Sequence, residues 1–105
     1  MATGRLAGSD LAAGANTTVY TTPADTYTVA SVNIVNRGTQ PTVLNLAIAD
    51  LNTPTLGEYI EWETELLPKN ILERTGIVLG ATQKIVVRSS QANVSVVAFG
   101  IETTG

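Results

Sequence analysis

The sequence predicts an all-β fold: a single antiparallel β-sandwich of about seven strands, preceded by a flexible N-terminal arm. Three observations carry this prediction. Seven segments alternate their side chains with a period of two, short turn-prone stretches separate these segments, and no segment keeps the 3.6-residue period of an amphipathic helix. A jelly-roll and an immunoglobulin-like topology both fit this spacing, so the strand order stays open. The expected division is an arm over residues 1–16 and a β-sandwich domain over residues 17–105.

The first sixteen residues are rich in Ala and Gly and keep no sustained periodicity. They allow two interpretations. One is a frayed terminus, which is common at chain ends. The other is an arm that is mobile in the free protein and orders against a neighbouring subunit, with Leu6 and Leu11 as apolar anchors. Both leucines are therefore candidate interface residues.

The expected strands follow from residue 17 onward. They cover residues 17–22, 27–36, 42–50, 58–66, 71–79, 84–90 and 93–101. In the second, the alternation puts Ala30, Val32 and Ile34 on one face and the side chains between them on the other. In the third, it assigns Leu44, Leu46 and Ile48 to the buried face. Two such sheets packed face to face bury their apolar faces and leave the Thr, Asn and Glu faces in water.

The segment "EYIEWETEL" (58–66) is the clearest amphipathic strand. Alternation puts Trp62 on the buried face with Ile60, so replacing Trp62 by Ala is expected to cost about 3–5 kcal/mol, as for large core aromatics. Phe99 of the last strand is expected in the core as well. The glutamates of this segment form a row, Glu58, Glu61, Glu63 and Glu65, which we interpret as a solvated face rather than a cation site, because a row does not converge on one point.

The composition bears on the function classes. The net charge is −3 and the six Lys and Arg residues are scattered singly, so no nucleic-acid partner is expected. The chain has no His and no Cys, and no serine has a motif linking it to an activating lysine. We therefore expect no enzyme, no catalytic residue, no metal and no cofactor. No apolar run reaches membrane-spanning length, so no membrane partner is expected either.

Charged residues make up only 14 % of the chain, below the usual share of about 25 %. A weakly charged surface tolerates contact with other proteins. Tyr59, on the outward face beside the glutamates, is a candidate interface residue because Tyr offers a large area with few rotamers. Arg37, in the turn "NRG", is either a solvated turn residue or part of an interface ion pair. If the arm is not the docking element, the rim loops around Arg37 and Leu51–Gly57 are the alternative.

The segments "MATGRL", "NTTVYTTPADTYTVASVNIVNRG", "EYIEWETELLPKNILERTGIVLGATQKIVVRSS" and "NVSVVAFGIE" together resemble the small virion structural proteins of tailed bacteriophages. The resemblance spans most of the chain and supplies no catalytic residue. It implies a β-sandwich subunit present in many copies and attached to the capsid, neck or tail. It also implies a virion location, after synthesis in the cytoplasm of the bacterial host.

Three functions follow as hypotheses. The first is a capsid decoration or cement protein that binds and stabilises major-capsid subunits, as a homo-oligomer such as a trimer or hexamer. The alternative is a neck, tail or fibre-attachment component of the same particle. A remoter alternative is a carbohydrate-binding module, which would need several coplanar exposed aromatic side chains. Copy number per particle separates the first two.

Overall fold

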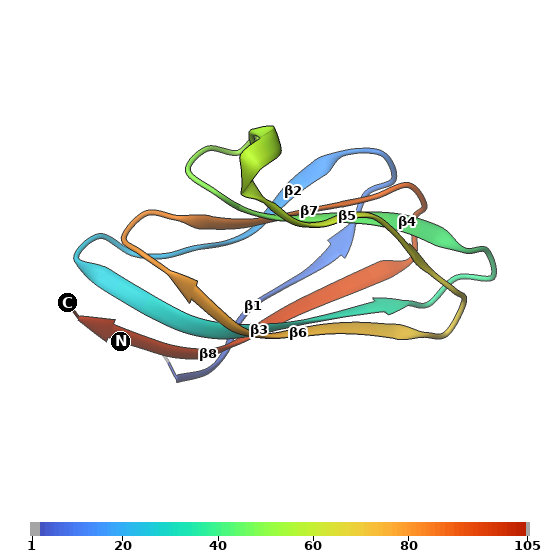
Figure 1. Cartoon of the computed structure of the whole chain (residues 1–105). Coiled ribbons are helices and arrows are strands. Elements are labelled where there is room, and N and C mark those ends of the chain that lie inside the picture. Colours follow the sequence, from blue (N-terminus) through green and yellow to red (C-terminus); the bar gives the residue numbers. More distant parts are fainter. Residues whose placement is uncertain (1–2, 105) are drawn as a thin grey trace.

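The computed structural model describes residues 3–104 as two four-stranded antiparallel sheets packed face to face (Figure 1). Sheet A has the order β1-β8-β3-β6, and sheet B has the order β2-β7-β4-β5. The strands are β1 (Thr3–Leu11), β2 (Asn16–Thr21), β3 (Thr26–Asn36), β4 (Thr42–Ala49), β5 (Tyr59–Leu66), β6 (Ile71–Leu79), β7 (Lys84–Ser89) and β8 (Val94–Thr104), with one 3₁₀ turn, η1 (Leu56–Glu58). The prediction of an all-β antiparallel sandwich is confirmed.

The strand order decides between the two topologies that the sequence left open. The first strand pairs with the last, the second with the seventh, the third with the sixth and the fourth with the fifth. This is the pairing of one long hairpin, with its tip at the β4–β5 connection, rolled into two sheets. Pairing of β3 with β8 and of β4 with β7 joins the rolled halves. The arrangement is that of a jelly roll, and the immunoglobulin-like alternative does not apply.

The core lies between the sheets and is built by the predicted alternation. Of the three side chains predicted to face inward in residues 42–50, Leu44 and Leu46 are fully buried and Ile48 packs against the core. Ala30, Val32 and Ile34, which were predicted to share one face, are the residues of β3 that enter the core. The buried cluster consists of Leu11, Val19, Tyr20, Ala30, Val32, Ile34, Leu44, Leu46, Leu66, Ile77, Leu79, Ile85, Val87, Val94, Val96 and Ala98. Aliphatic side chains dominate it, so its stability comes from the burial of apolar surface.

The predicted N-terminal arm is wrong for the described residues. Residues 3–11 form β1, which runs antiparallel to β8 from Thr3 opposite Ile101 to Leu11 opposite Val94. Leu11 is 2 % exposed and belongs to the core, and Leu6 packs against that core. The physical reason is the unpaired edge that β8 would otherwise present, because edge N–H and C=O groups need partners. There are therefore eight strands instead of about seven, and residues 1–2 lie outside the described part.

Two predicted core aromatics lie on the outside. Trp62 is 54 % exposed, because the pairing of β5 with β4 shifts register twice and Glu63 adopts a left-handed φ of 49°. A bulge of this kind turns the following side chains to the other face. Phe99 points outward because side chains alternate along β8, and Val94, Val96 and Ala98 occupy its inward positions. The large cost expected for replacing a core Trp62 therefore does not apply.

The two ends of the sandwich are closed by polar side chains. At one end, Tyr20 of sheet B donates its hydroxyl hydrogen to Glu102 and is 3.0 Å from the hydroxyl of Thr28, both in sheet A. Burial, together with the neighbouring Glu102, raises the pKa of Tyr20. At the other end, the fully buried Asn36 donates two hydrogen bonds from Nδ2, to the carbonyls of Gln40 (2.8 Å) and Leu66 (3.0 Å).

Candidate protein-binding surfaces

Most of the exposed large apolar side chains gather on two separate parts of the molecule. The first, here called the sheet A patch, consists of Tyr27, Val29, Val78, Phe99 and Ile101 on the outer face of sheet A. The second is the connection between β4 and β5, residues 50–58, here called the docking loop, with Trp62 of β5 following it. The two lie on opposite layers of the sandwich (Figure 1).

Strand register makes the sheet A patch continuous. Val29 of β3 lies opposite Val78 of β6 on one side and opposite Ile101 of β8 on the other. Phe99 is two residues from Ile101, and Tyr27 is two residues from Val29, so both share this face. Directly opposite side chains in antiparallel strands have Cβ atoms about 5 Å apart. The five side chains therefore form one apolar surface rather than isolated exposures, which single apolar residues would be.

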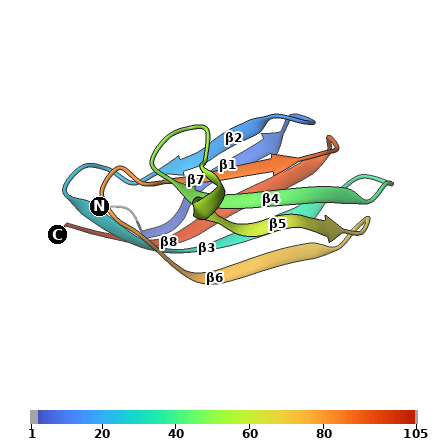
Figure 2. The ribbon, with the colours of Figure 1, turned by 45° about the horizontal axis from the view of Figure 1, so that its top comes forward.

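The docking loop folds over the outer face of sheet B (Figures 1 and 2). Small or β-branched residues beneath it, Ala47, Ala49 and Val86, are buried although they lie outside the inter-sheet core, and η1 contacts β4. Above this support the loop presents Leu51 and Leu56, which are 71 % and 81 % exposed. The loop thus contacts β4 and leaves its largest apolar side chains exposed to solvent.

Hydrogen bonds hold the docking loop in place. The carboxylate of Glu58 accepts from the backbone N–H of Thr55 (2.8 Å) and from that of Asp50 (3.2 Å), so it joins both ends of the loop. Thr18 of β2 donates its hydroxyl to Oδ1 of Asn52 at 2.7 Å. Thr55 and Glu58 form a capping box around η1. The exposed leucines are therefore displayed by an ordered element.

The Glu58 carboxyl provides a pH test of this loop. Its pKa is lowered from the usual 4.5, first by the hydrogen bond from the Thr55 backbone and then by that from Asp50. Because the pKa in the folded chain is below that in the unfolded chain, the ionised form stabilises the fold above pH 4.5, and this contribution is lost as the pH falls through the folded pKa. We expect an NMR titration of the Glu58 carboxyl carbon to show a midpoint below 4.5.

The control for this titration is Thr55→Pro, which removes the donating N–H at a φ of −85°, close to what proline adopts. The Glu58 midpoint should move back toward its usual value in this variant. A parent midpoint at or above 4.5, or one that Thr55→Pro leaves in place, would show that the carboxylate does not organise the loop.

The predicted row of glutamates does not exist as one row. Glu61 pairs with Arg74 of β6 across the open edge between the sheets and accepts from the Thr64 hydroxyl at 2.7 Å. The hydrogen bond from Thr64 and the pairing with Arg74 lower the pKa of Glu61. Within residues 3–104 no group of three acidic side chains converges in a way that could hold a metal ion.

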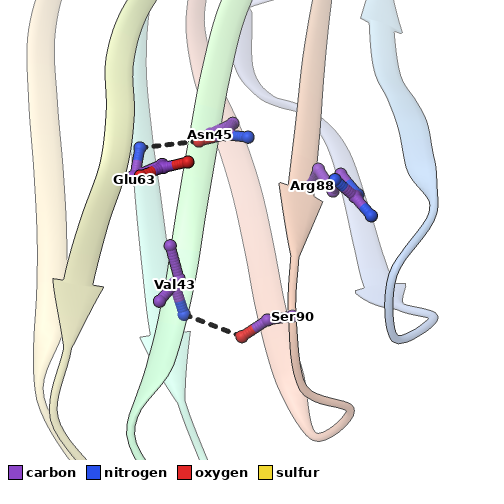
Figure 3. Close-up of a pocket in the computed structure, with 5 residues that line it drawn as sticks. All are labelled: Val43, Asn45, Glu63, Arg88 and Ser90. Carbon is purple, nitrogen blue, oxygen red and sulfur yellow. Dashed lines mark hydrogen bonds between the residues drawn. The ribbon is translucent and has the colours of Figure 1, made fainter.

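A shallow groove lies on the outer face of sheet B beside the bulge. Its lining residues are Val43, Asn45, Glu63, Arg88 and Ser90 (Figure 3). Asn45 Oδ1 accepts from the backbone N–H of Glu63 at 2.7 Å, and Ser90 Oγ accepts from that of Val43 at 3.0 Å. The Asn45 side chain thus fixes the bulge of β5, and the Ser90 side chain ties the start of β4 to the end of β7, so the groove is a consequence of strand pairing.

The four candidate interface residues from the sequence have different positions. Leu6 and Leu11 contact the core of their own chain, so neither is an exposed anchor. Arg37 forms an exposed ion pair with Asp10 at the end of β1 and so fastens that strand to the β3–β4 turn. Tyr59 is half-buried and packs edge-to-face against Trp62, with ring centroids 4.8 Å apart.

Sequence reasoning missed the sheet A patch. Both faces of β3 and β8 carry Val, Ile, Ala or Phe, so alternation alone could not separate an apolar outer face from the core. It also missed the exposed aromatic pair. The planes of Tyr59 and Trp62 are inclined by 73°, whereas a flat sugar-binding platform would need coplanar rings.

Comparisons with known proteins were negative. No protein-family model, no curated protein and no solved structure matches this chain. Among the described residues, no helix has the length and apolar character to cross a membrane. The resemblance to phage virion proteins therefore stays a sequence-based expectation, and the function is argued from the surfaces described above.

Proposed function

We propose that this chain is a non-enzymatic structural protein of a phage virion, a capsid decoration protein that binds and stabilises major-capsid subunits. The observation that carries this proposal is the docking loop, an ordered element that exposes two leucines. Burying a Leu side chain in an interface contributes about 1.5–3 kcal/mol. A loop that is already ordered loses little conformational freedom on binding, so more of that contribution remains as affinity.

Irregular strand pairing at the edges of both sheets favours binding through a loop or a sheet face over binding by addition of a strand to an edge. Each of the four edge strands contains a register shift: β1 after Arg5, β2 after Thr18, β5 in its pairing with β4, and β6 around Gly76. Bulges twist an edge away from the flat geometry that another strand would need. Strand addition at an edge is therefore disfavoured, which suits a subunit that must meet its partner in one defined way.

The jelly-roll topology is compatible with this role. Viral capsid domains use it, but so do lectins and cupins, so the fold supports the proposal by analogy alone. The low share of charged residues and the resemblance to virion proteins also support a structural role in a virion. A particle also offers many equivalent sites, so modest contacts act together when the subunits are linked to one another.

The proposal predicts the effect of Leu56→Asp on attachment to particles. Purified chain would be mixed with phage heads assembled without it, and the bound fraction measured by co-sedimentation and gel densitometry. A charge at a buried interface position should weaken attachment about tenfold or more, since a central apolar contact contributes 2 kcal/mol or more. The melting temperature should stay unchanged, because Leu56 is exposed in the free chain.

The matched control is Leu67→Asp. Leu67 is an exposed leucine in the turn at the other end of β5, away from the docking loop. It should leave attachment unchanged. Equal weakening by both variants would argue against the docking loop as the contact, and parent chain that fails to bind the heads at all would refute the decoration role.

A further inference from the structure

We propose that the outer face of sheet A binds a second copy of this chain, related by a twofold axis that runs along the strands. This surface is separate from the docking loop. The inference rests on the proposed role only for its biological meaning, because the association itself is a property of the purified chain.

The centre of the proposed interface is the sheet A patch. Val78, Val29 and Ile101 form a row across three neighbouring strands, and Phe99 and Tyr27 extend it along β8 and β3. Val78 alone is 63 % exposed. Exposure of this apolar centre to water is unfavourable, and its burial against a similar surface is favourable.

The size of the face suits a dimer of ordinary affinity. Four strands about 4.8 Å apart give a width of about 19 Å. β3 and β8 have eleven residues and β1 and β6 have nine, so the mean strand length is about 34 Å. The face therefore measures about 650 Å², somewhat below the roughly 800 Å² per partner of a standard interface. Two such sheets would pack as the two sheets of a sandwich do.

Charge complementarity selects the occupant and the symmetry axis. Arg5 on β1 lies opposite Phe99, at one side of the face, and Glu73 on β6 lies opposite Asn33, at the other side. Both are exposed. Phe99 also lies opposite Ser31, so the two charges are only one step of two residues, about 7 Å, apart along the strands.

A twofold axis along the strands places β1 of one copy over β6 of the other. Each Arg5 then lies over the strand that carries Glu73 of the opposing copy, within reach of its long side chain, and the dimer gains two equivalent ion pairs at its rim. An axis across the strands would place β1 over β1 and leave both charges without an opposite. Asp10, the acidic residue of β1, is already paired with Arg37.

The test is a charge-reversal cycle followed by sedimentation equilibrium over a range of concentrations. The parent should associate with a mass of two copies, or of six if three such pairs close into a ring. Arg5→Glu and Glu73→Arg should each raise the dissociation constant about tenfold, because each reverses two rim contacts per dimer. The double variant should restore association to within about threefold of the parent.

Lys84→Glu is the matched control, since it makes the same change of charge on β7 of sheet B and should leave association unchanged. A monomer at all concentrations, a mass of three copies, or a double variant as weak as the single ones would overturn the inference. A chain that stays monomeric yet attaches to heads through Leu56 would overturn this inference and leave the proposed function standing. A chain that shows the expected charge cycle but does not attach to heads would overturn the proposed function and leave this inference standing.

Discussion

Gly100→Ala is expected to lower the free energy of unfolding by about 3 kcal/mol or more, the largest effect of a methyl group added at any of the described glycines. Gly100 lies in β8 between Gly4 of β1 and Ala30 of β3 and has a φ of 155°. A Cβ atom built there would lie 2.1 Å from the backbone oxygen of Val29. Backbone atoms in the middle of a sheet cannot move aside, so strain and overpacking both add to the cost.

Thermal denaturation measures this effect. For a domain of this size, about 3 kcal/mol corresponds to a decrease in melting temperature of about 12 °C or more. Gly57→Ala is the control, because its added Cβ meets no atom within 4 Å and its φ lies outside the left-handed range. If Gly100→Ala melted within a degree or two of Gly57→Ala, the close approach of β8 and β3 would be wrong.

Asn36→Ala is expected to lower the free energy of unfolding by about 2–4 kcal/mol. Besides its two donated bonds to Gln40 and Leu66, the Asn36 side chain accepts from the Gly38 N–H at 2.9 Å. Alanine leaves these three backbone groups without their partner, and an unsatisfied buried polar group costs about 1–3 kcal/mol. The turn "NRG" would also lose the contact that holds it against the end of β5.

Urea denaturation of Asn36→Ala, with Asn52→Ala as the matched control, checks this expectation. Asn52 makes one exposed side-chain hydrogen bond, to Thr18, so its replacement should cost less than about 0.5 kcal/mol. Equal midpoints for the two variants would show that Asn36 is not the residue that joins β3, the following turn and β5.

The sequence predicted the elements well because burial on one side gives a strand a readable period. The strand β3, for example, alternates fully buried Ala30, Val32 and Ile34 with partly exposed neighbours. Strand order could not be read in the same way, because it depends on which distant edges meet. The pairing of β1 with β8 joins the two ends of the chain, and nothing local in the Gly-rich residues 3–11 indicates that partner.

The candidate surfaces were harder to predict than the fold. A bulge adds a residue to one strand only, so the alternation that placed Trp62 inside failed at the register shifts between β4 and β5. Leu11 resembled an exposed anchor because its flanking residues are small, whereas β8 supplies a buried position for it. Leu51 and Leu56 lie in a non-repeating loop, where no periodic pattern indicates which side chains face water.

The most direct test of the central claim is the number of copies of this chain in a purified virion, measured by quantitative gel densitometry against the major capsid protein or by particle reconstruction. A capsid decoration protein occupies every equivalent site, so we expect hundreds of copies on the head surface, with the docking loop against the capsid. A dozen copies or fewer, at the neck or tail, would contradict the decoration role, and absence from washed particles would contradict a virion role altogether.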